Sequence, residues 1–454
     1  MIYEKSIDRR KFLISSSVGA SALALGMRGY GKKGEESPTR RINSPNNTIQ
    51  VGMIAVGARA HQLMETIKKI PGTEIVGVCD AYKGRVERAI ERTGGRAKDY
   101  GNYREILADK DIDAVVISTP DHLHTHEAID AIQAGKHIYI EKPLTYTVDE
   151  GLAIIKAAKK NKIAFQVGSS GSSSVLSQKA REIIASGKLG QVTMVRAYYN
   201  RNTASGAWIY PIPPDASPKT VDWNMFLGPA PEQPFSLERF FRWRCYKDYS
   251  GGIATDLFVH LCNSIHYIMG VEMCHSAMGM GGLYRWKKSR DVSDTVNASL
   301  EYSEGFMTSI SSTFNNRKVG GSGIQFLGTE GTLELAGGKL VFTPEIVNEN
   351  NGWIVQSWPS KLEKAYYEDP EVRAEERTWT RDPALVQGAE TYQAQGLDST
   401  TIHFMEFFDA VRKGTPTKED AVVGHHAASC AHMANLSIEK KRIIYWDKAR
   451  DTVK

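Results

Sequence analysis

The chain has few cysteines, and none of them belongs to a recognisable metal or disulfide motif. It contains five, an odd number, and no two are separated by just two residues. They are Cys79, Cys245, Cys262, Cys274 and Cys430. This scatter argues against a structural zinc site and against a framework of disulfides. We expect buried thiols, with one disulfide as the remaining alternative in an oxidising compartment.

Long apolar runs and a strong excess of one charge are also missing. Beyond the N-terminal segment no apolar run has the length that crosses a bilayer, so stable membrane insertion is not expected. The net charge is +5, with 57 Lys and Arg against 52 Asp and Glu. Part of this excess comes from Lys5, Arg9, Arg10 and Lys11. The rest of the chain is nearly balanced, which gives no reason to expect nucleic-acid binding.

The N-terminus has the pattern of an export signal. Arg9 and Arg10 precede a Phe-Leu pair and a short apolar stretch diluted with Ser, Gly and Ala. This pattern resembles a twin-arginine signal, which we expect to occupy residues 1–27. Residues 28–48 have the composition of a linker. The expected location is therefore the periplasm, and an ordinary disordered tail is the alternative.

Residues 49–57 form an apolar stretch typical of a strand that ends in a turn of small residues. A helical stretch follows, and then a second strand closed by Asp80, roughly 20 residues after the turn as a dinucleotide site requires. Such a turn lets a pyrophosphate approach the N-terminus of a helix. The carboxylate of Asp80 would bind ribose hydroxyls and repel a 2′-phosphate. We therefore expect NAD as the cofactor rather than NADP.

The glycine pattern of this turn is incomplete. Where a dinucleotide fingerprint has three glycines, this chain has Ala55, Gly57 and Ala60. Gly57 lies where the backbone must come closest to phosphate, and alanine is small enough for the other two positions. Ala55, Gly57, Ala58 and Arg59 are therefore the expected cofactor-binding residues of the turn. On this motif alone, an ordinary strand–turn–helix is an equal alternative.

The segments that follow favour the nucleotide-binding interpretation. Three apolar strands alternate with two helices between residues 113 and 167. This alternation predicts an α/β domain with a doubly wound parallel sheet. Ligands of such sheets bind beyond the carboxyl ends of the strands. Thr119, Pro120, Glu141 and Lys142 lie at those ends and complete the expected cofactor-binding set.

Three short motifs carry a resemblance to a known family. They are Ser-Thr-Pro-Asp-His-Leu-His at 118–124, Ala-Gly-Lys-His at 134–137 and Glu-Lys-Pro-Leu at 141–144. Together they closely resemble the Gfo/Idh/MocA oxidoreductases. The resemblance covers essentially everything from Ile49 onward, and the Glu-Lys-Pro run is highly specific in this context.

The resemblance implies a division into two domains. An NAD-binding Rossmann domain is expected at 49–168, and a C-terminal α+β domain with a large open, mostly antiparallel sheet at 169–440. The last helices of the second domain are expected to pack back near the first. This leaves 441–454 as a C-terminal tail. The open sheet of the family implies a homodimer or homotetramer.

Residues 248–260 match the family's second signature, a glycine-rich turn that leads into a helix. Asp256 and His260 are four residues apart, on one face of that helix, so both can point into one cleft. With Lys142 they reproduce the family's Lys–Asp–His set. The family pattern also places His124 near the cofactor. The alternatives are structural: a solvated Lys142, a helix-capping Asp256 and a core His260.

These residue types suit the oxidation of a secondary alcohol, which needs a base within reach of the hydroxyl proton. Imidazole has the pKa best suited to this role, so His260 is assigned as the general base, or as the acid in the reverse direction. Asp256 would orient it or bind a neighbouring hydroxyl. Lys142 would hold the reacting oxygen. Lys142 and His260 could exchange the proton role.

Aromatic and arginine residues are dense between 201 and 247. Rings stack on the C–H faces of sugars, and guanidinium groups bind hydroxyls or a carboxylate. Arg244 and Tyr246, just before the signature helix, are the additional substrate candidates beside Lys142 and Asp256.

No metal ion is expected. His122, His124 and His126 alternate at a loop-to-helix junction but lack the acidic partners of a metal site. We expect His122 and His126 to be structural or surface residues.

The predicted function is NAD(P)-dependent oxidation or reduction at a secondary hydroxyl of a sugar, glycoside or polyol. The periplasm has no steady supply of free NAD, so the cofactor must stay tightly held. One alternative is a redox-neutral NAD-dependent glycosidase or epimerase, although Ile-Ala-Thr-Asp follows Gly252 where the glycosidase branch leads us to expect a Tyr-Pro-Thr-His type. Another is a non-catalytic sugar-binding module with structural NAD, which the intact Lys142, Asp256 and His260 disfavour.

Overall fold

The computed structural model describes residues 48–454 except 289, 318–320, 347–350, 373 and 375–387. The export signal expected at 1–27, and all but the last residue of the expected linker, lie outside the described residues. Within the described part of the chain, no helix has both the length and the apolar character that crossing a bilayer requires.

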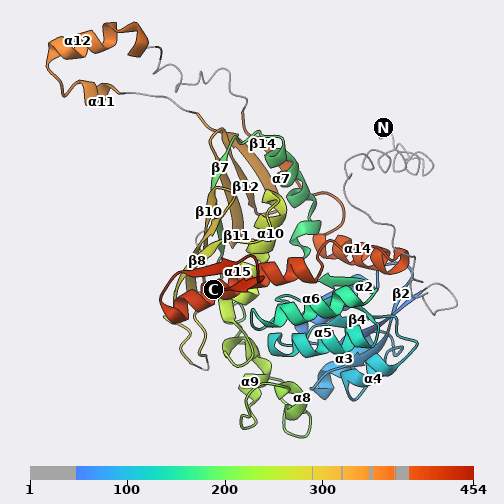
Figure 1. Ribbon diagram of the computed structural model, residues 1–454. Helices are drawn as coiled ribbons and strands as arrows, with labels where there is room; N and C mark the ends of the chain where they lie inside the picture. Colours follow the sequence, from blue (N-terminus) through green and yellow to red (C-terminus); the bar gives the residue numbers. More distant parts are fainter. Residues whose placement is uncertain (1–47, 289, 318–320, 347–350, 373, 375–387) are drawn as a thin grey trace, which may run out of the picture. The chain divides into compact units, whose positions relative to one another are not determined.

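The N-terminal domain is built on a six-stranded sheet (Figure 1). Its strands are β1 (Ile49–Ile54), β2 (Thr73–Cys79), β3 (Lys98–Asp99), β4 (Ala114–Ile117), β5 (His137–Ile140) and β6 (Phe165–Val167). Their order is β3-β2-β1-β4-β5-β6, and all neighbours are parallel. The order reverses between β1 and β4, which is where doubly wound sheets bind ligands. The predicted Rossmann fold is confirmed.

Helices cover both faces of this sheet. They are α2 (Ala58–Ile67), α3 (Lys83–Arg92), α4 (Tyr103–Ala108), α5 (His124–Gln133) and α6 (Glu150–Lys160). One apolar core contains residues of α2 and α3, and the other contains residues of α4, α5 and α6. Strands β4 and β5 are buried along their whole length, which explains why their sequences are apolar runs without alternation.

The second domain contains a ten-stranded sheet. Its strands are β7 (Val192–Tyr199), β8 (Ser276–Gly282), β9 (Thr295–Tyr302), β10 (Phe306–Thr313), β11 (Ser322–Gly328), β12 (Gly331–Ala336), β13 (Lys339–Pro344), β14 (Glu390–Gln393), β15 (Ile444–Asp447) and β16 (Thr452–Val453). The order is β14-β13-β12-β11-β7-β10-β9-β8-β15-β16. Only β7 and β10 pair in parallel among these described strands. The predicted large, mostly antiparallel sheet is confirmed.

Helices of the second domain bury the inner face of this sheet. Its longer helices are α7 (Val175–Ala185), α10 (Val259–Met269), α14 (Ser399–Lys413) and α15 (Ala421–Lys440), and its short ones are α8 (Trp223–Leu227), α9 (Leu237–Phe241), α11 (Gly352–Val355) and α12 (Ser360–Glu368). Helices α7, α10 and α15 share one core with the sheet. A π-helical turn at Ala254–Phe258 leads directly into α10.

Helix α14 packs on the first domain. The ring of Phe404 stacks on that of Tyr139 with centroids 4.1 Å apart. Phe404, Phe407 and Phe408 are fully buried in the same core as α2. Helix α14 therefore contributes side chains to the core of the Rossmann domain.

Residues 441–454, treated as a tail in the sequence analysis, continue the sheet. β15 pairs with β8, and β16 pairs with β15. Ile444 and Trp446 are buried. A strand of four residues shows too little alternation to be recognised from sequence.

All five cysteines are buried free thiols, as the sequence indicates. Four of them, Cys245, Cys262, Cys274 and Cys430, belong to the core that α10, α15 and the sheet share. The sulfur atoms of Cys274 and Cys430 are 3.2 Å apart.

Candidate active site

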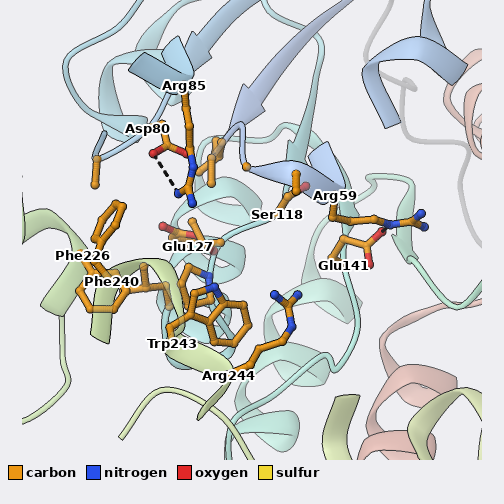
Figure 2. A pocket seen from close by; sticks show the side chains of 18 of the residues that line it. Arg59, Asp80, Arg85, Ser118, Glu127, Glu141, Phe226, Phe240, Trp243 and Arg244 are labelled. Atoms are coloured by element: carbon orange, nitrogen blue, oxygen red, sulfur yellow. Dashed lines mark hydrogen bonds and ion pairs between the residues drawn. The ribbon is translucent and has the colours of Figure 1, made fainter. Parts of the chain in front are cut away.

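A cleft of about 1060 Å³ lies beyond the carboxyl ends of the parallel strands, and its other wall comes from the second domain (Figure 2). Twelve of the fourteen residues predicted from sequence line it. They are Ala55, Gly57, Ala58, Arg59, Asp80, Thr119, Pro120, Glu141, Lys142, Arg244, Asp256 and His260. The other two, His124 and Tyr246, are not among the described lining residues.

The turn after β1 forms one end of the cleft. Ala55 adopts the left-handed conformation, with φ at 61°. Gly57 precedes α2, and no side chain among the described residues caps this helix start. A Cβ added to Gly57 would meet only Arg85, at 3.8 Å or more, so the space in front of the turn is open. Uncapped N–H groups at a helix N-terminus are a site for an anionic group.

Asp80 follows β2 and is fixed by the backbone. Its two carboxylate oxygens accept N–H groups from Val56 at 2.9 Å and Tyr82 at 2.8 Å. The Nη1 atom of Arg85 lies 3.5 Å from Asp80 Oδ1 (Figure 2). The guanidinium of Arg85 also lies over two phenylalanine rings of the second domain, at 5.3 and 5.2 Å from their centroids. Arg85 belongs to no motif, and the sequence analysis did not identify it.

This end of the cleft fits the adenosine and pyrophosphate of a dinucleotide. The open turn at Gly57 offers backbone N–H groups to phosphate. The oriented carboxylate of Asp80 offers acceptors to ribose hydroxyls. Gly57, Ala58 and Asp80 are therefore the residues that would hold that half of the cofactor.

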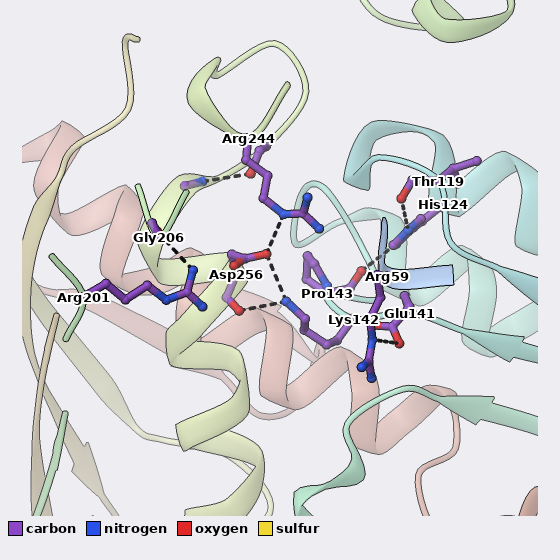
Figure 3. Close-up of polar contacts among 12 residues, drawn as sticks. Arg59, Thr119, His124, Glu141, Lys142, Pro143, Arg201, Gly206, Arg244 and Asp256 are labelled. Atoms are coloured by element: carbon purple, nitrogen blue, oxygen red, sulfur yellow. Dashed lines mark hydrogen bonds and ion pairs between the residues drawn. The ribbon is translucent and has the colours of Figure 1, made fainter. Parts of the chain in front are cut away.

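His124 supports the cleft from behind. Its ring nitrogens lie 2.7 Å from the carbonyl oxygen of Pro143 and 3.0 Å from that of Thr119 (Figure 3). Burial lowers the pKa of His124 to about 4, so the ring is neutral and donates to one carbonyl at a time. This contact connects the turn at Thr119 to the segment that carries Lys142.

A glutamate that the sequence analysis missed also lines the cleft. Glu127 accepts a hydrogen bond from the hydroxyl of Thr119 at 2.6 Å. Burial raises the pKa of Glu127 to about 8. The neighbouring ion pair joins Arg59 and Glu141 at 3.0 Å. The carboxyl ends of β4 and β5 are thereby cross-linked to α5 and α2.

Asp256 is the centre of a charged cluster (Figure 3). Its Oδ1 atom accepts from Lys142 Nζ at 3.1 Å and from Arg244 Nε at 2.9 Å. Lys142 Nζ also donates to the backbone oxygen of Asp256 at 2.8 Å. Burial opposes ionisation of Asp256, but Lys142 and Arg244 outweigh it and hold the pKa of Asp256 below its usual range. The cluster joins Lys142 of the first domain to the second domain.

His260 lines the same cleft one helical turn beyond Asp256. Asp256 bonds Lys142 and Arg244 rather than His260, so the expected orienting contact is absent among the described residues. Burial and, next, the charge of Lys142 lower the pKa of His260 well below its usual range. The imidazole is therefore neutral at neutral pH and able to accept a proton.

Tyr246 lies outside the cleft, and Arg201 lies in it. Tyr246 is buried, and the guanidinium of Arg239 is 4.5 Å from its ring centroid. It packs in the core rather than against a substrate. Arg201 follows β7, lines the cleft and donates to the carbonyl of Gly206 at 3.2 Å. The irregular loop around Arg201 has no periodicity from which its direction could be read.

The comparisons with known proteins agree with this architecture. Residues 49–169 match the family described as the oxidoreductase family with an NAD-binding Rossmann fold. Residues 224–334 match the GFO/IDH/MocA C-terminal domain. The chain belongs to the GFO/IDH/MocA family, and NAD is the cofactor of its N-terminal domain.

Particular relatives are similar to this chain over lengths that differ from one relative to the next. The inositol 2-dehydrogenase of Salmonella typhimurium is 32% identical over 159 residues, 34% of this chain and 47% of that protein. The α-N-acetylgalactosaminidase of Shewanella oneidensis is 38% identical over 120 residues, 25% of this chain and 26% of that protein. The match thus spans about half of one relative and a quarter of the other. A levoglucosan dehydrogenase, solved with NADH and levoglucosan, is 20% identical with a TM-score of 0.63, covering 88% of this chain and 99% of that one.

Proposed function

We propose that this protein is an NAD-dependent oxidoreductase that acts on a secondary hydroxyl of a sugar, glycoside or polyol. The observation that carries the proposal is the single cleft that joins a dinucleotide turn to the Lys142–Asp256–Arg244 cluster and a neutral His260. The similarity to an inositol 2-dehydrogenase and the fold shared with a levoglucosan dehydrogenase support the same class of substrate.

Each residue of the cluster has a separate role in this reaction. Lys142 Nζ carries three N–H groups, and two of them bond Asp256, which leaves one for the reacting oxygen. Asp256 stays ionised and fixes Lys142 and Arg244. His260 takes the hydroxyl proton. NAD, which Gly57, Ala58 and Asp80 would hold, would supply the acceptor for the hydride of the carbinol carbon. An alcohol and NAD⁺ thus give a ketone, NADH and one proton.

Absorbance near 340 nm tests the proposal. Purified protein with added NAD and a panel of sugars and polyols should form NADH with at least one of them. His260→Ala and Lys142→Met should each lower kcat/KM for that substrate by about 10²- to 10⁴-fold. His275→Ala is the matched control, because His275 is exposed and outside the described cleft lining. Wild-type protein that reduces no NAD with any polyhydroxy compound would contradict the proposal.

A redox-neutral glycosidase is the second candidate. It rests on the similarity to an α-N-acetylgalactosaminidase over 120 residues, 25% of this chain. Incubation with nitrophenyl glycosides separates the two. Release of nitrophenol without net NADH formation would favour the glycosidase, whereas NADH formation without release favours the dehydrogenase.

We also propose that the protein is exported by the twin-arginine route and keeps its cofactor bound through turnover. The support is the Arg9-Arg10 motif. A fusion of residues 1–48 to a reporter should reach the periplasm, and replacing Arg9 and Arg10 with lysine should retain it in the cytoplasm.

Mass spectrometry of the purified, denatured protein should detect NAD that was never added. Loss of the cofactor during gel filtration would contradict tight binding.

A homodimer or homotetramer is proposed as the assembly. Exposed apolar side chains on the sheet support it, since Met278, Met280 and Met307 are 52%, 72% and 45% exposed. Adjacent apolar residues on an exposed sheet face are typical of an interface between subunits. Light scattering during gel filtration measures the mass directly, and a monomer at micromolar concentration would refute this assignment.

A further inference from the structure

The inner end of the cleft carries more positive than negative charge. We define it as Lys142, Arg201, Arg244, Asp256 and His260, all of which line the cavity. Three cations stand against one carboxylate, and the imidazole is uncharged. Binding of an alcohol and stabilisation of its oxygen need only one cation. The two arginines are therefore in excess of what the oxidation step requires.

Neighbouring groups do not cancel this excess. Asp121 is 3% exposed, and its Oδ2 atom has no hydrogen-bond partner in the described part of the chain. Burial raises the pKa of Asp121 to about 7, which weakens its negative charge at neutral pH. Arg59 and Glu141 pair with each other at 3.0 Å and are neutral together.

Both arginines keep unpaired donors. Arg244 bonds Asp256 through Nε alone, and Arg201 bonds Gly206 through Nη1 alone. Within the described residues, the remaining terminal nitrogens of the two guanidinium groups have no hydrogen bond or ion pair. In Figure 3 the guanidinium of Arg201 extends toward Asp256 from the side opposite Lys142. The free donors therefore approach the region around Asp256 from two directions.

Aromatic rings contact both guanidinium groups. Arg244 lies over the ring of Trp243 at 4.1 Å from its centroid, and Arg201 over that of Tyr199 at 5.1 Å. Stacking removes conformational freedom before a ligand binds. A planar, oriented fork of N–H groups is suited to the two oxygens of a carboxylate.

The loop that holds Arg201 is strained. Trp208 is fully buried and adopts φ of 65°, a conformation that is strained for a bulky residue. Arg290 holds this conformation by donating to the carbonyl of Ala207 at 2.6 Å. Backbone strain of this kind occurs where surrounding contacts fix a functional geometry. Trp208 follows Gly206 closely in the chain, and the carbonyl of Gly206 accepts the hydrogen bond from Arg201.

We infer that the substrate is an acidic sugar, with a carboxylate that Arg201 and Arg244 bind while Lys142 holds the reacting oxygen. This inference rests on the proposed function and names its substrate class, a uronic acid or uronide. The carboxylate neutralises the excess charge at the inner end of the cleft. A neutral sugar leaves the guanidinium of Arg201 without an anionic partner and that of Arg244 with Asp256 as its only one among the described residues.

Matched pairs of sugars test the inference. Methyl β-D-glucuronide and methyl β-D-glucoside differ only in the carboxylate, and the two galactose analogues form a second pair. The holoenzyme should oxidise the better uronide with kcat/KM about 10- to 100-fold above its neutral partner. Equal or better turnover of the neutral sugars would overturn the inference while leaving the proposed oxidoreductase intact.

Substitution of Arg201 assigns the effect to the inner end of the cleft. Arg201→Gln should raise KM for the uronide about 10-fold or more and change kcat by much less, and Arg201→Lys should give an intermediate KM. Arg196→Gln is the matched control, since Arg196 is exposed on β7 and outside the described cleft lining. A uronide preference that persists in Arg201→Gln would overturn the assignment of Arg201 as a residue that binds the carboxylate.

Binding provides a readout that does not depend on turnover. Calorimetric titration of the holoenzyme with each member of a pair should show tighter binding of the uronide, and Arg201→Gln should abolish the difference. If no sugar is oxidised, the proposed function fails, and this titration alone decides the inference. Equal binding of charged and neutral sugars by the wild-type protein would then refute it.

Discussion

At the scale of single residues, the site depends on a histidine that its surroundings keep neutral. Burial and the charge of Lys142 lower the pKa of His260. A histidine with a lowered pKa stays deprotonated, and active as a base, at pH values below the usual histidine pKa of about 6.5. We therefore predict that kcat/KM for alcohol oxidation does not fall between pH 8 and 6.5, and declines only at lower pH.

A pH–rate profile checks this prediction. Lys142→Met should raise the pKa of His260 toward its ordinary value, which NMR of the imidazole protons measures even if turnover is slow. Lys156→Met, an exposed substitution on α6, is the control and should shift neither the profile nor the resonance. A wild-type acid limb at or above pH 6.5 would be incompatible with the environment of His260.

Cofactor selectivity is also a property of single residues. Asp80 repels a 2′-phosphate, and Arg85 lies 3.5 Å from its carboxylate. Asp80→Ser should free Arg85 to bind that phosphate, and raise the NADP-to-NAD ratio of kcat/KM about 100-fold. The double variant with Arg85→Gln should lose the gain. Arg88→Gln on the exposed side of α3 should not affect the ratio, and an unchanged ratio in Asp80→Ser would contradict the assignment.

Most site residues were predicted from the sequence because they directly follow a strand or belong to a motif. Lys142 and Asp80 could be predicted in this way because the carboxyl ends of the strands of a parallel sheet lie along one edge. Arg85, Glu127 and Arg201 were missed because they lie in a helix or a loop without a motif. The contact of Asp256 with two cations was also not predictable, because it depends on how the two domains meet.

At the scale of elements, the first strand–turn–helix contains a measurable strain. Ala55 has φ of 61°, which costs a non-glycine residue about 1–2 kcal/mol. We predict that Ala55→Gly increases the free energy of unfolding by about 1 kcal/mol, as measured by urea denaturation. Ala58→Gly, three residues later at the start of α2, should give no gain, since a helical position favours alanine. Equal effects of the two changes would exclude strain at Ala55.

The fully buried strands β4 and β5 were predictable, whereas β3 and β15 were not. Strands β4 and β5 were recognised from their continuous apolar runs. β3 has two residues and β15 has four, so neither provides enough periods to define a pattern. Both residues of β3 are exposed, and β15 pairs with β8, a distant part of the chain, so the local sequence does not predict either pairing.

At the scale of the whole described fold, α14 links the end of the chain to the cofactor domain. Phe404 is fully buried and stacks on Tyr139 at 4.1 Å. Phe404→Ala should lower the free energy of unfolding by about 3–5 kcal/mol, the usual effect of removing a buried aromatic ring. Met405→Ala on the same helix is the matched control, because Met405 is 45% exposed, and it should cost well under 1 kcal/mol.

The same substitution tests whether the two domains unfold together. The core around Phe404 includes β1, β2 and α2. Removal of the Phe404 ring should therefore destabilise the dinucleotide turn as well as α14, and NAD should bind more weakly. Intrinsic fluorescence and release of bound NAD, followed in one urea titration, should therefore shift to lower urea in parallel. A lower fluorescence midpoint with unchanged NAD release would mean that α14 unfolds separately, and that the cofactor domain does not depend on the C-terminal helix for its stability.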